Sequence, residues 1–321
     1  MIIFGEMEKM PVQEKQLVVA LGNFDGVHRG HQQLLRQMTA YAQKNNALAA
    51  VILFQPHPQQ VLNPSKCPKL LLDTDKKIEL LEKQGVQGIF IVPFDIDFAS
   101  LAPEEFIDKI LVGKLQVTGV FVGYDYRFGR TAEGTPELLR ELGKQKGFYV
   151  EVVPPVLFME TPISSTLVRK ALSTGDIRWA KELLGYWPVL RGKIMTGDQR
   201  GRKLGFPTAN IHVSDELLVL QNGVYAGEAL IKGKHYLTVT NIGVHPTFGS
   251  SCQKLIEAHL LDFQGDIYHE DIEISLFKRL RDERKFESPD RLIKQIHKDI
   301  EIAIKIYDDH ENNSIKRDVQ A

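Results

Sequence analysis

The stretch "QLVVALGNFDGVHRGHQQLL", residues 16–35, contains the pattern that decides the fold. An apolar run from Leu17 to Leu21 leads into a glycine-rich turn, and apolar residues at helical spacing follow the turn. Such a run suits a strand buried on both faces of a parallel sheet, and the spacing after it predicts a helix. Two histidines, His28 and His31, stand where the strand changes into the helix. Because a helix start presents unpaired N–H groups and a positive dipole end, this turn is a candidate phosphate site.

The same alternation of strand-like and helix-like segments continues to about residue 155. Short apolar runs occupy residues 47–54, 88–94, 117–123 and 148–155. Amphipathic segments occupy residues 31–46, 75–85, 103–115 and 136–147. Strands that alternate with helices predict βαβ units and an α/β doubly wound parallel sheet. Ligands of such sheets bind at the carboxyl ends of the strands, which is where the two histidines stand.

The second part of the chain has a different pattern. After a helical stretch at 165–188, short strand-like runs separated by glycine-containing turns occupy residues 189–197, 223–231, 234–243, 254–263 and 271–280. This pattern predicts a small antiparallel β-barrel. Residues 288–309 predict a closing C-terminal helix, with Ser288 as its N-cap before Pro289. We therefore expect two domains, residues 1–185 and 186–321.

Composition limits the class of protein. The 321 residues include 40 basic and 41 acidic side chains, for a formal net charge of -1. Because a net charge near zero creates no overall electrostatic field, we expect no nucleic-acid partner and no membrane partner. An anionic ligand would therefore need a local site. Two cysteines make no disulfide framework, and the N-terminus lacks the pattern of a signal peptide. We expect a cytoplasmic protein.

The histidine turn has more than one interpretation from its residues alone. A zinc-protease site needs a glutamate beside the first histidine and a spacing of four, and both are absent from the sequence. Histidines near a helix start can simply cap the helix. Gly22, Gly26 and Gly30, however, allow the backbone to approach a ligand closely. Helix capping and phosphate binding therefore both remain open at this point.

Four segments resemble one family in order along the chain. The segment "GNFDGVHRGH", residues 22–31, resembles the histidine-glycine-histidine signature of the nucleotidyltransferase superfamily, in the form found in bacterial FAD synthetases. The segment "ISSTLVRKAL", residues 163–172, resembles the second signature of that family. Between them, "FQPHP" at 54–58 and "GYDYRFG" at 123–129 resemble further family segments. The resemblance covers most of the N-terminal half.

This resemblance implies a Rossmann-like nucleotidyltransferase domain in which the phosphate of FMN attacks the α-phosphorus of ATP, giving FAD and pyrophosphate. His28 and His31 would donate to α-phosphate oxygens, and Arg169 would hold the β- or γ-phosphate as a fork. The implied ATP-binding residues are Gly22, Asn23, Phe24, Asp25, Gly30, Ser164, Ser165 and Thr166. The implied flavin-binding residues are His57, Asp125 and Arg127. From position alone, His57 could be a structural turn residue, and Asp125 and Arg127 a surface ion pair.

The densest signal in the second half is "GDQRGRKLGFPTANI", residues 197–211. No Gly-Lys-Ser/Thr closes it, so it is not a Walker loop. Its glycines and basic residues can still present N–H groups and positive charge to phosphates. Thr208 and Asn210 offer uncharged oxygens suited to Mg²⁺ that bridges a nucleotide. The alternative is an ordinary basic hairpin turn.

The segment "GFPTAN", residues 205–210, closely resembles the signature of riboflavin kinases, and further matching segments follow at 223–227, 241–249, 255–263 and 279–288. The resemblance implies a riboflavin kinase-like barrel that transfers the γ-phosphate of ATP to the 5′-hydroxyl of riboflavin. Glu257 stands at the family's catalytic-glutamate position and would act as the base. The implied ATP-binding residues are Gly201, Arg202, Gly205, Pro207, Thr208 and Asn210. The sequence departs from the family at His245 and at His269, where relatives usually carry asparagine and glycine.

Together the two resemblances predict a bifunctional enzyme of flavin-cofactor biosynthesis. Its substrates and products would be ATP, riboflavin, FMN, FAD and pyrophosphate, with Mg²⁺ required, and the chain would be a monomer or a weak homo-oligomer. One alternative is an enzyme in which a single domain is active. Another is a regulatory protein that senses flavin, and binds flavin or RNA without turnover.

Overall fold

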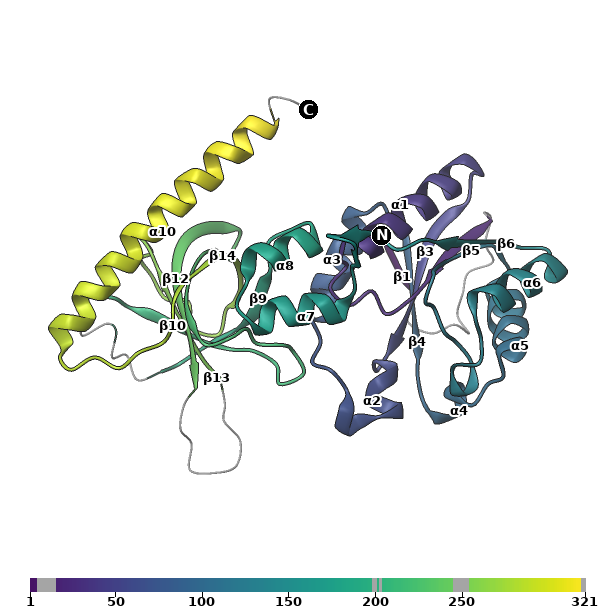
Figure 1. Cartoon of the computed structure of the whole chain (residues 1–321), viewed down its shortest axis with the longest axis horizontal. Helices are drawn as coiled ribbons and strands as arrows, with labels where there is room; N and C mark the ends of the chain where they lie inside the picture. The colour runs from purple at the N-terminus through teal and green to yellow at the C-terminus, as the bar shows by residue number, and fades with distance from the viewer. Residues whose placement is uncertain (5–15, 198–200, 202–203, 245–253, 319–321) are drawn as a thin grey trace. The chain divides into compact units, whose positions relative to one another are not determined.

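The computed structural model in Figure 1 describes residues 1–4, 16–197, 201, 204–244 and 254–318. The chain divides into two compact units, Met1–Ser165 and Thr166–Ala321. The two units are described separately below.

The first unit is built on a parallel sheet of six strands in the order β1-β4-β3-β2-β5-β6. In chain order these are β1 (Ile2–Phe4), β2 (Leu17–Leu21), β3 (Leu48–Gln55), β4 (Gly88–Pro93), β5 (Val117–Gly123) and β6 (Tyr149–Val153). All five residues of β2 are buried, and the strand lies between β3 and β5. The predicted α/β parallel sheet is therefore confirmed. The edge strand β1 was not predicted.

Helices connect the strands of the first unit. They are α1 (Arg29–Lys44), α2 (Pro58–Leu62), α3 (Thr74–Lys83), α4 (Ile96–Ala99), α5 (Pro103–Phe106) and α6 (Pro136–Lys146). The segment after α5, Ile107–Lys114, continues as π-helix, so the helix predicted at 103–115 changes its winding along its length. A short hairpin of β7 (Leu157–Phe158) and β8 (Thr161–Pro162) follows β6.

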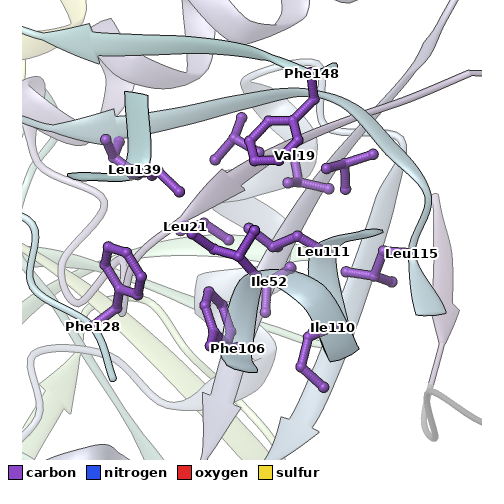
Figure 2. Packing of buried hydrophobic residues seen from close by; sticks show 14 of the residues in the cluster. Val19, Leu21, Ile52, Phe106, Ile110, Leu111, Leu115, Phe128, Leu139 and Phe148 are labelled. Atoms are coloured by element: carbon purple, nitrogen blue, oxygen red, sulfur yellow. The ribbon is translucent and has the colours of Figure 1, made fainter. Parts of the chain in front are cut away.

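A hydrophobic core fixes the central strand (Figure 2). Leu17, Val19 and Leu21, which alternate along β2, join a buried cluster with side chains of β3, of β5, and of α5 and its π-helical continuation. The labelled members of this cluster include Ile52, Phe106, Ile110, Leu111, Phe128 and Leu139. Burial of each large apolar side chain contributes about 1.5–3 kcal/mol. The core therefore holds the carboxyl end of β2, and with it the start of the histidine turn, in a fixed place.

The second unit is a closed antiparallel barrel with the strand order β10-β13-β12-β11-β14-β9. The strands are β9 (Val189–Met195), β10 (Thr208–His212), β11 (Gly223–Ile231), β12 (Lys234–Val244), β13 (Lys254–Leu260) and β14 (Asp271–Arg281). Five of them match the predicted runs, and the barrel is confirmed. The sixth, β10, was not predicted, because its residues were interpreted as part of the phosphate-binding segment 197–211.

Helices accompany the barrel strands as well. They are α7 (Ser165–Ser173), which begins at the last residue of the first unit, α8 (Ile177–Leu184), and α10 (Pro289–Asp318). Figure 1 shows α10 lying along the outside of the barrel, and it continues beyond its predicted end. Its residue Ala303 packs in one apolar cluster with Val224, Ala226 and Val239 of the strands. Helix α10 therefore covers the outer face of the barrel over β11 and β12.

An ion pair adds to this apolar attachment of α10. The guanidinium of Arg281, at the end of β14, donates to the carboxylate of Asp299 from Nε at 3.0 Å and from Nη2 at 2.8 Å. The side-chain amide of Gln295 donates to the same carboxylate at 2.8 Å. Asp299 is 2% exposed. The carboxylate is therefore buried with its hydrogen-bonding capacity in use.

Replacing Asp299 by alanine is expected to lower the free energy of unfolding of the second unit by about 3 kcal/mol or more. The change leaves the mostly buried guanidinium of Arg281 without its carboxylate, which costs more than the pair itself contributes. Urea unfolding followed by tryptophan fluorescence measures this unit, because both tryptophans of the chain, Trp179 and Trp187, belong to it. The control is Asp308→Ala on the exposed face of the same helix, expected to stay within about 0.5 kcal/mol. An equal effect of both variants would contradict the role of the pair.

Candidate active sites

The turn that follows β2 has an unusual backbone. Phe24 and Val27 adopt positive φ values of 47° and 36°, and Gly26 between them has φ of 83°. A left-handed conformation strains residues with a Cβ, and such strain persists where the surroundings impose it. Phe24 and Val27 are each 1% exposed, so their burial holds the turn in this shape. The strained turn places the two histidines at the start of α1.

His28 is the N-cap of α1, and its Nδ1 accepts a hydrogen bond from the backbone N–H of His31 at 3.3 Å. The two imidazole rings stack, with centroids 3.7 Å apart and planes inclined by 16°. The capping interpretation is therefore correct for one edge of His28. Because Nδ1 accepts a hydrogen bond, it carries no proton, and the neutral ring has its proton on Nε2. His28 thus caps the helix with Nδ1 and carries its proton on Nε2.

His31 is also held neutral. Burial lowers the pKa of His31 well below its ordinary value, and repulsion by the protonated form of His28 and by Lys77 lowers it further. Its Nδ1 is shielded from solvent and has no hydrogen-bond partner among the residues that the structure describes. A buried N–H without a partner is rarer than a buried acceptor without one, so we assign the proton to Nε2. Both imidazoles then offer an Nε2–H at the start of one helix.

His31 is expected to remain neutral as the pH falls through its ordinary pKa of 6.5. The pKa of His31 is lower in the folded chain than in the unfolded chain. The neutral ring of His31 therefore contributes fully to stability above pH 6.5, and this contribution is lost as the pH falls toward the folded pKa. The loss is at most about 1.4 kcal/mol per pH unit. NMR of ¹³C-labelled histidine, assigned with His31→Gln, measures the titration. A midpoint at or above 6.5 would contradict the assignment.

Asp25 anchors the turn to distant parts of the first unit. Its carboxylate accepts the backbone N–H of Leu71, at 3.0 Å to Oδ1 and 3.2 Å to Oδ2. Its backbone carbonyl accepts the hydroxyl of Ser165 at 2.8 Å. Asp25 is 2% exposed. These contacts fix the turn, and the predicted contact of Asp25 with ATP stays a prediction.

The two signatures of the first resemblance meet at this point. Besides the bond from Ser165, a Cβ added to Gly30 would lie 3.5 Å from the carbonyl oxygen of Ile163, so the start of α1 lies against the chain just before Ser164. Gly22 and Asn23 form the beginning of the turn, and a Cβ at Gly22 would lie 3.2 Å from the ring of Phe24. The remaining predicted residues, Thr166 and Arg169, follow on α7 in the second unit.

The predicted flavin residues follow the strands on either side of β2. His57 comes after β3 and caps α2, where its Nδ1 accepts the backbone N–H of Gln59 at 3.1 Å. Asp125 and Arg127 are exposed in the turn after β5, and Arg127 donates to the carbonyl of Tyr126 at 2.9 Å. The strands β3, β2 and β5 run parallel and adjacent. Their carboxyl ends therefore share one edge of the sheet, which is the ligand-binding edge in such folds.

In the second unit, strand register brings the predicted kinase residues together. Glu257 of β13 lies directly opposite Asn210 of β10 on one side and Asn241 of β12 on the other. Directly opposed residues of antiparallel strands have Cβ atoms about 4.5–5.5 Å apart on the same face. The flanking Ile256 and Ala258 are buried, which puts this row of three on the outer face of the barrel. Glu257 thus lies beside Asn210, and Asn241 is an addition from the structure.

Glycines let the loop before β10 lie directly on these side chains. A Cβ at Gly197 would overlap the amide of Asn210, and a Cβ at Gly201 would overlap the carbonyl of Phe206 and lie 3.3 Å from Oγ1 of Thr208. Gly205 has φ of 88°, a conformation that favours glycine. Two residues further along the loop, the carbonyl of Pro207 accepts a hydrogen bond from Nδ1 of His259 at 2.8 Å. Arg202 lies outside the described residues.

One departure from the family pattern has a structural explanation. His269 has φ of 67°, in the left-handed region where glycine is favoured, and its backbone N–H donates to the carbonyl of Ile194 at 2.8 Å. The residue is exposed, so the imidazole meets no core. The chain thus adopts the glycine conformation with a histidine in place. His245 lies outside the described residues.

Two sequence families match the two parts of the chain. Residues 10–167 match the family model described as FAD synthetase, and residues 184–307 match the model described as riboflavin kinase. None of the helices in the described ranges combines the length and the apolar character that a membrane span needs.

Individual proteins match over nearly the whole length. A bifunctional riboflavin kinase/FMN adenylyltransferase of Buchnera aphidicola subsp. Schizaphis graminum is 40% identical over 292 residues, which is 90% of this chain and 93% of that protein. The protein of the same name from Bacillus subtilis is 38% identical, with 92% of this chain and 94% of that protein covered. A crystal structure titled as a macrolide-efflux protein from Streptococcus pneumoniae is similar with a TM-score of 0.86 and 31% identity, covering 94% of this chain and 99% of that one. The chain belongs to the family of bifunctional riboflavin kinase/FMN adenylyltransferases.

Proposed function

We propose that this chain makes FAD from riboflavin in two ATP-dependent steps, phosphorylation to FMN and adenylylation of FMN with release of pyrophosphate. The observation that carries the proposal is the meeting of distant motifs within each unit. In the first unit the histidine turn is bonded to Ser165 of the second signature. In the second unit Glu257 lies opposite Asn210 of the "GFPTAN" segment. Both pairings bring together groups that phosphoryl chemistry requires.

Phosphorylation of riboflavin needs a base for a primary alcohol. Glu257 is half-buried on the outer face of the barrel, where its carboxylate accepts the proton of the ribityl 5′-hydroxyl as that oxygen attacks the γ-phosphorus. The oxygen that bridges the β- and γ-phosphates leaves with ADP. Asn241, in the same row, is placed to orient the carboxylate or the alcohol. Glycine backbone N–H groups at 201 and 205 face the phosphates.

The oxygens beside Glu257 fit Mg²⁺. Thr208 and Asn210 are two positions apart on β10, so their side chains share the outer face of the barrel. Among the described residues, no group of three or more His, Cys, Asp or Glu could hold a metal ion. Mg²⁺ keeps waters and is bound by few protein oxygens together with substrate phosphates. Thr208 and Asn210 would hold the ion, which neutralises phosphate charge when bound. Its identity as Mg²⁺ is part of this proposal.

Adenylyl transfer needs positioning and donors rather than a covalent intermediate. The phosphate oxygen of FMN attacks the α-phosphorus of ATP, and the α–β bridging oxygen leaves with pyrophosphate. The Nε2–H groups of His28 and His31 donate to the α-phosphate oxygens as their charge increases, and the start of α1 adds backbone donors. Arg169 as a phosphate fork, and His57, Asp125 and Arg127 as flavin contacts, remain proposals at these positions. We assign adenylyl transfer to residues 1–185 and phosphoryl transfer to residues 186–321.

Incubation of the pure chain with riboflavin, ATP and Mg²⁺, followed by chromatography, tests the proposal. FMN is expected first and FAD after it, and FMN supplied directly is expected to give FAD. A chain that performs one step alone would support the alternative of a single active domain. A chain that binds flavin but forms neither product would support the regulatory alternative and overturn the proposal.

A further inference from the structure

His259 lies two positions after Glu257 on β13, so the two side chains share the outer face of the barrel. It stands directly opposite Thr208 of β10, just as Glu257 stands opposite Asn210. Directly opposed residues of antiparallel strands have Cβ atoms about 4.5–5.5 Å apart. His259 therefore adjoins both the proposed base and the proposed cation ligands.

The imidazole of His259 is bonded to the main chain of the loop that leads into β10. Its Nδ1 lies 2.8 Å from the carbonyl oxygen of Pro207. Because a carbonyl oxygen only accepts, Nδ1 carries a proton and donates it to this hydrogen bond. The carbonyl belongs to the planar peptide group that joins Pro207 to Thr208. The hydrogen bond therefore fixes the orientation of the peptide group that ends at the Cα atom of Thr208.

Proline at position 207 makes this hydrogen bond important for the loop. Pro207 has no N–H, so its carbonyl is the main-chain group through which a hydrogen bond holds this residue. The residue before it, Phe206, is fixed separately, because its N–H donates to the carbonyl of Gly201 at 2.9 Å and its side chain is buried. The residue after it, Thr208, is the first of β10. The bond from His259 thus fastens the loop immediately before the proposed cation ligand.

The ring of His259 also packs against the loop. It meets the ring of Phe206 edge to face, with centroids 5.6 Å apart and planes inclined by 81°. The ring of His297, on α10, makes a similar contact with Phe206, with centroids 5.1 Å apart and planes inclined by 77°. The ring contact with Phe206 is thus common to both histidines, whereas the bond to Pro207 belongs to His259.

Phosphoryl transfer depends on positioning, and a displacement of about 1 Å in a positioned group costs up to about a hundredfold in rate. We propose that His259 is a positioning residue for the phosphorylation of riboflavin. Its Nδ1–H holds the peptide group between Pro207 and Thr208, so that the Thr208 oxygen is placed for the cation and the phosphates of ATP beside Glu257. This inference rests on the proposed kinase step. His259 acts through Thr208 and keeps its Nδ1 proton throughout.

Two variants of His259 separate the hydrogen bond from the ring contact. Asparagine carries an amide nitrogen the same number of bonds from the main chain as Nδ1, so His259→Asn keeps a donor for Pro207 and loses the ring. His259→Phe keeps an aromatic ring for Phe206 and loses the donor. The matched control is His297→Phe, which changes the other imidazole on Phe206 and leaves the bond to Pro207 in place.

For His259→Phe, the Mg²⁺ concentration that gives half-maximal phosphorylation of riboflavin is expected to rise about tenfold, as for the loss of one hydrogen bond. KM for riboflavin should stay near that of the parent, because Thr208 acts on the phosphate side of the reaction. His259→Asn should recover most of the loss, and His297→Phe should match the parent. FAD formation from FMN should be unchanged in all three variants, because the first unit is untouched.

Calorimetric titration with ADP, with and without Mg²⁺, gives a second measurement that needs no turnover. Mg²⁺ should strengthen ADP binding about tenfold less in His259→Phe than in the parent. This result in a parent that phosphorylates no riboflavin would support the inference and overturn the proposed function alone. A folded His259→Phe that binds ADP and Mg²⁺ as the parent does would overturn the inference, as would a parent whose ADP binding ignores Mg²⁺. Equal losses in His259→Asn or His297→Phe, or unfolding of both His259 variants by circular dichroism, would also overturn it.

Discussion

Replacing His31 by alanine is expected to lower the rate of FAD formation from FMN by about a hundredfold or more, while FMN formation from riboflavin stays near that of the parent. The reason is the loss of one directed donor to a developing phosphate charge, which typically costs a factor of a hundred to a thousand. The ring of His31 also stacks on His28 at 3.7 Å, so its removal frees the second imidazole to move. Single-turnover assays with FMN and ATP measure the effect.

A matched control separates chemistry from folding. Gln33→Ala changes a half-buried polar residue of the same helix, two positions from His31, and should leave FAD formation within about twofold of the parent, as expected for a surface change of a few tenths of a kcal/mol. The rate of the kinase step, measured on the same samples, shows whether the second unit remains folded and active. Equal loss of both steps in His31→Ala would indicate a general defect rather than a lost donor. Retention of parental FAD formation would exclude His31 from the reaction.

Replacing Glu257 by glutamine is expected to reduce phosphorylation of riboflavin by about a hundredfold or more, with riboflavin binding preserved. Glutamine keeps the shape of the side chain opposite Asn210 and removes its capacity to accept a proton. Because FMN supplied from outside bypasses this step, the variant should still convert FMN to FAD. Initial rates of ADP formation and fluorescence titration with riboflavin measure the two expectations.

The control for this variant is Glu270→Gln. Glu270 is an exposed carboxylate of the same unit, paired with Lys232 at 3.0 Å on the surface of the barrel, and its neutralisation should leave kinase turnover unchanged. If Glu257→Gln phosphorylates riboflavin at the parental rate, another group is the base. In that case the pairing of Glu257 with Asn210 would serve only to hold the strands together.

The sequence predicted the parts of the fold that have strong apolar periodicity. The runs that became β2 to β5 are continuous and apolar because both faces of the sheet are buried, so local composition was sufficient. The edge strand β1 has only three residues, of which Ile2 and Ile3 are more than half exposed, and such a segment carries almost no signal. Strand β10 was hidden because its residues were interpreted as part of a phosphate loop. Pairing with β9 and β13, rather than propensity, makes it a strand.

The same distinction applies to the candidate sites. His28, His31 and Glu257 stand in recognisable motifs, so the sequence was sufficient to name them as candidates. Asn241 was missed as a site residue because its place beside Glu257 follows from strand register. Long-range contacts of this kind have no local pattern.

The hydrogen bond from Ser165 to the carbonyl of Asp25 spans 140 residues, and this separation has a consequence during protein synthesis. At the usual 5–20 residues per second, a ribosome needs on the order of ten seconds to extend the chain from one partner to the other. Until Ser165 has been synthesised, the histidine turn lacks the segment that fastens it. A nascent chain that stalls within β6 would carry the strands of the sheet without the closed phosphate site. Such a fragment should therefore not consume ATP while it waits to be finished.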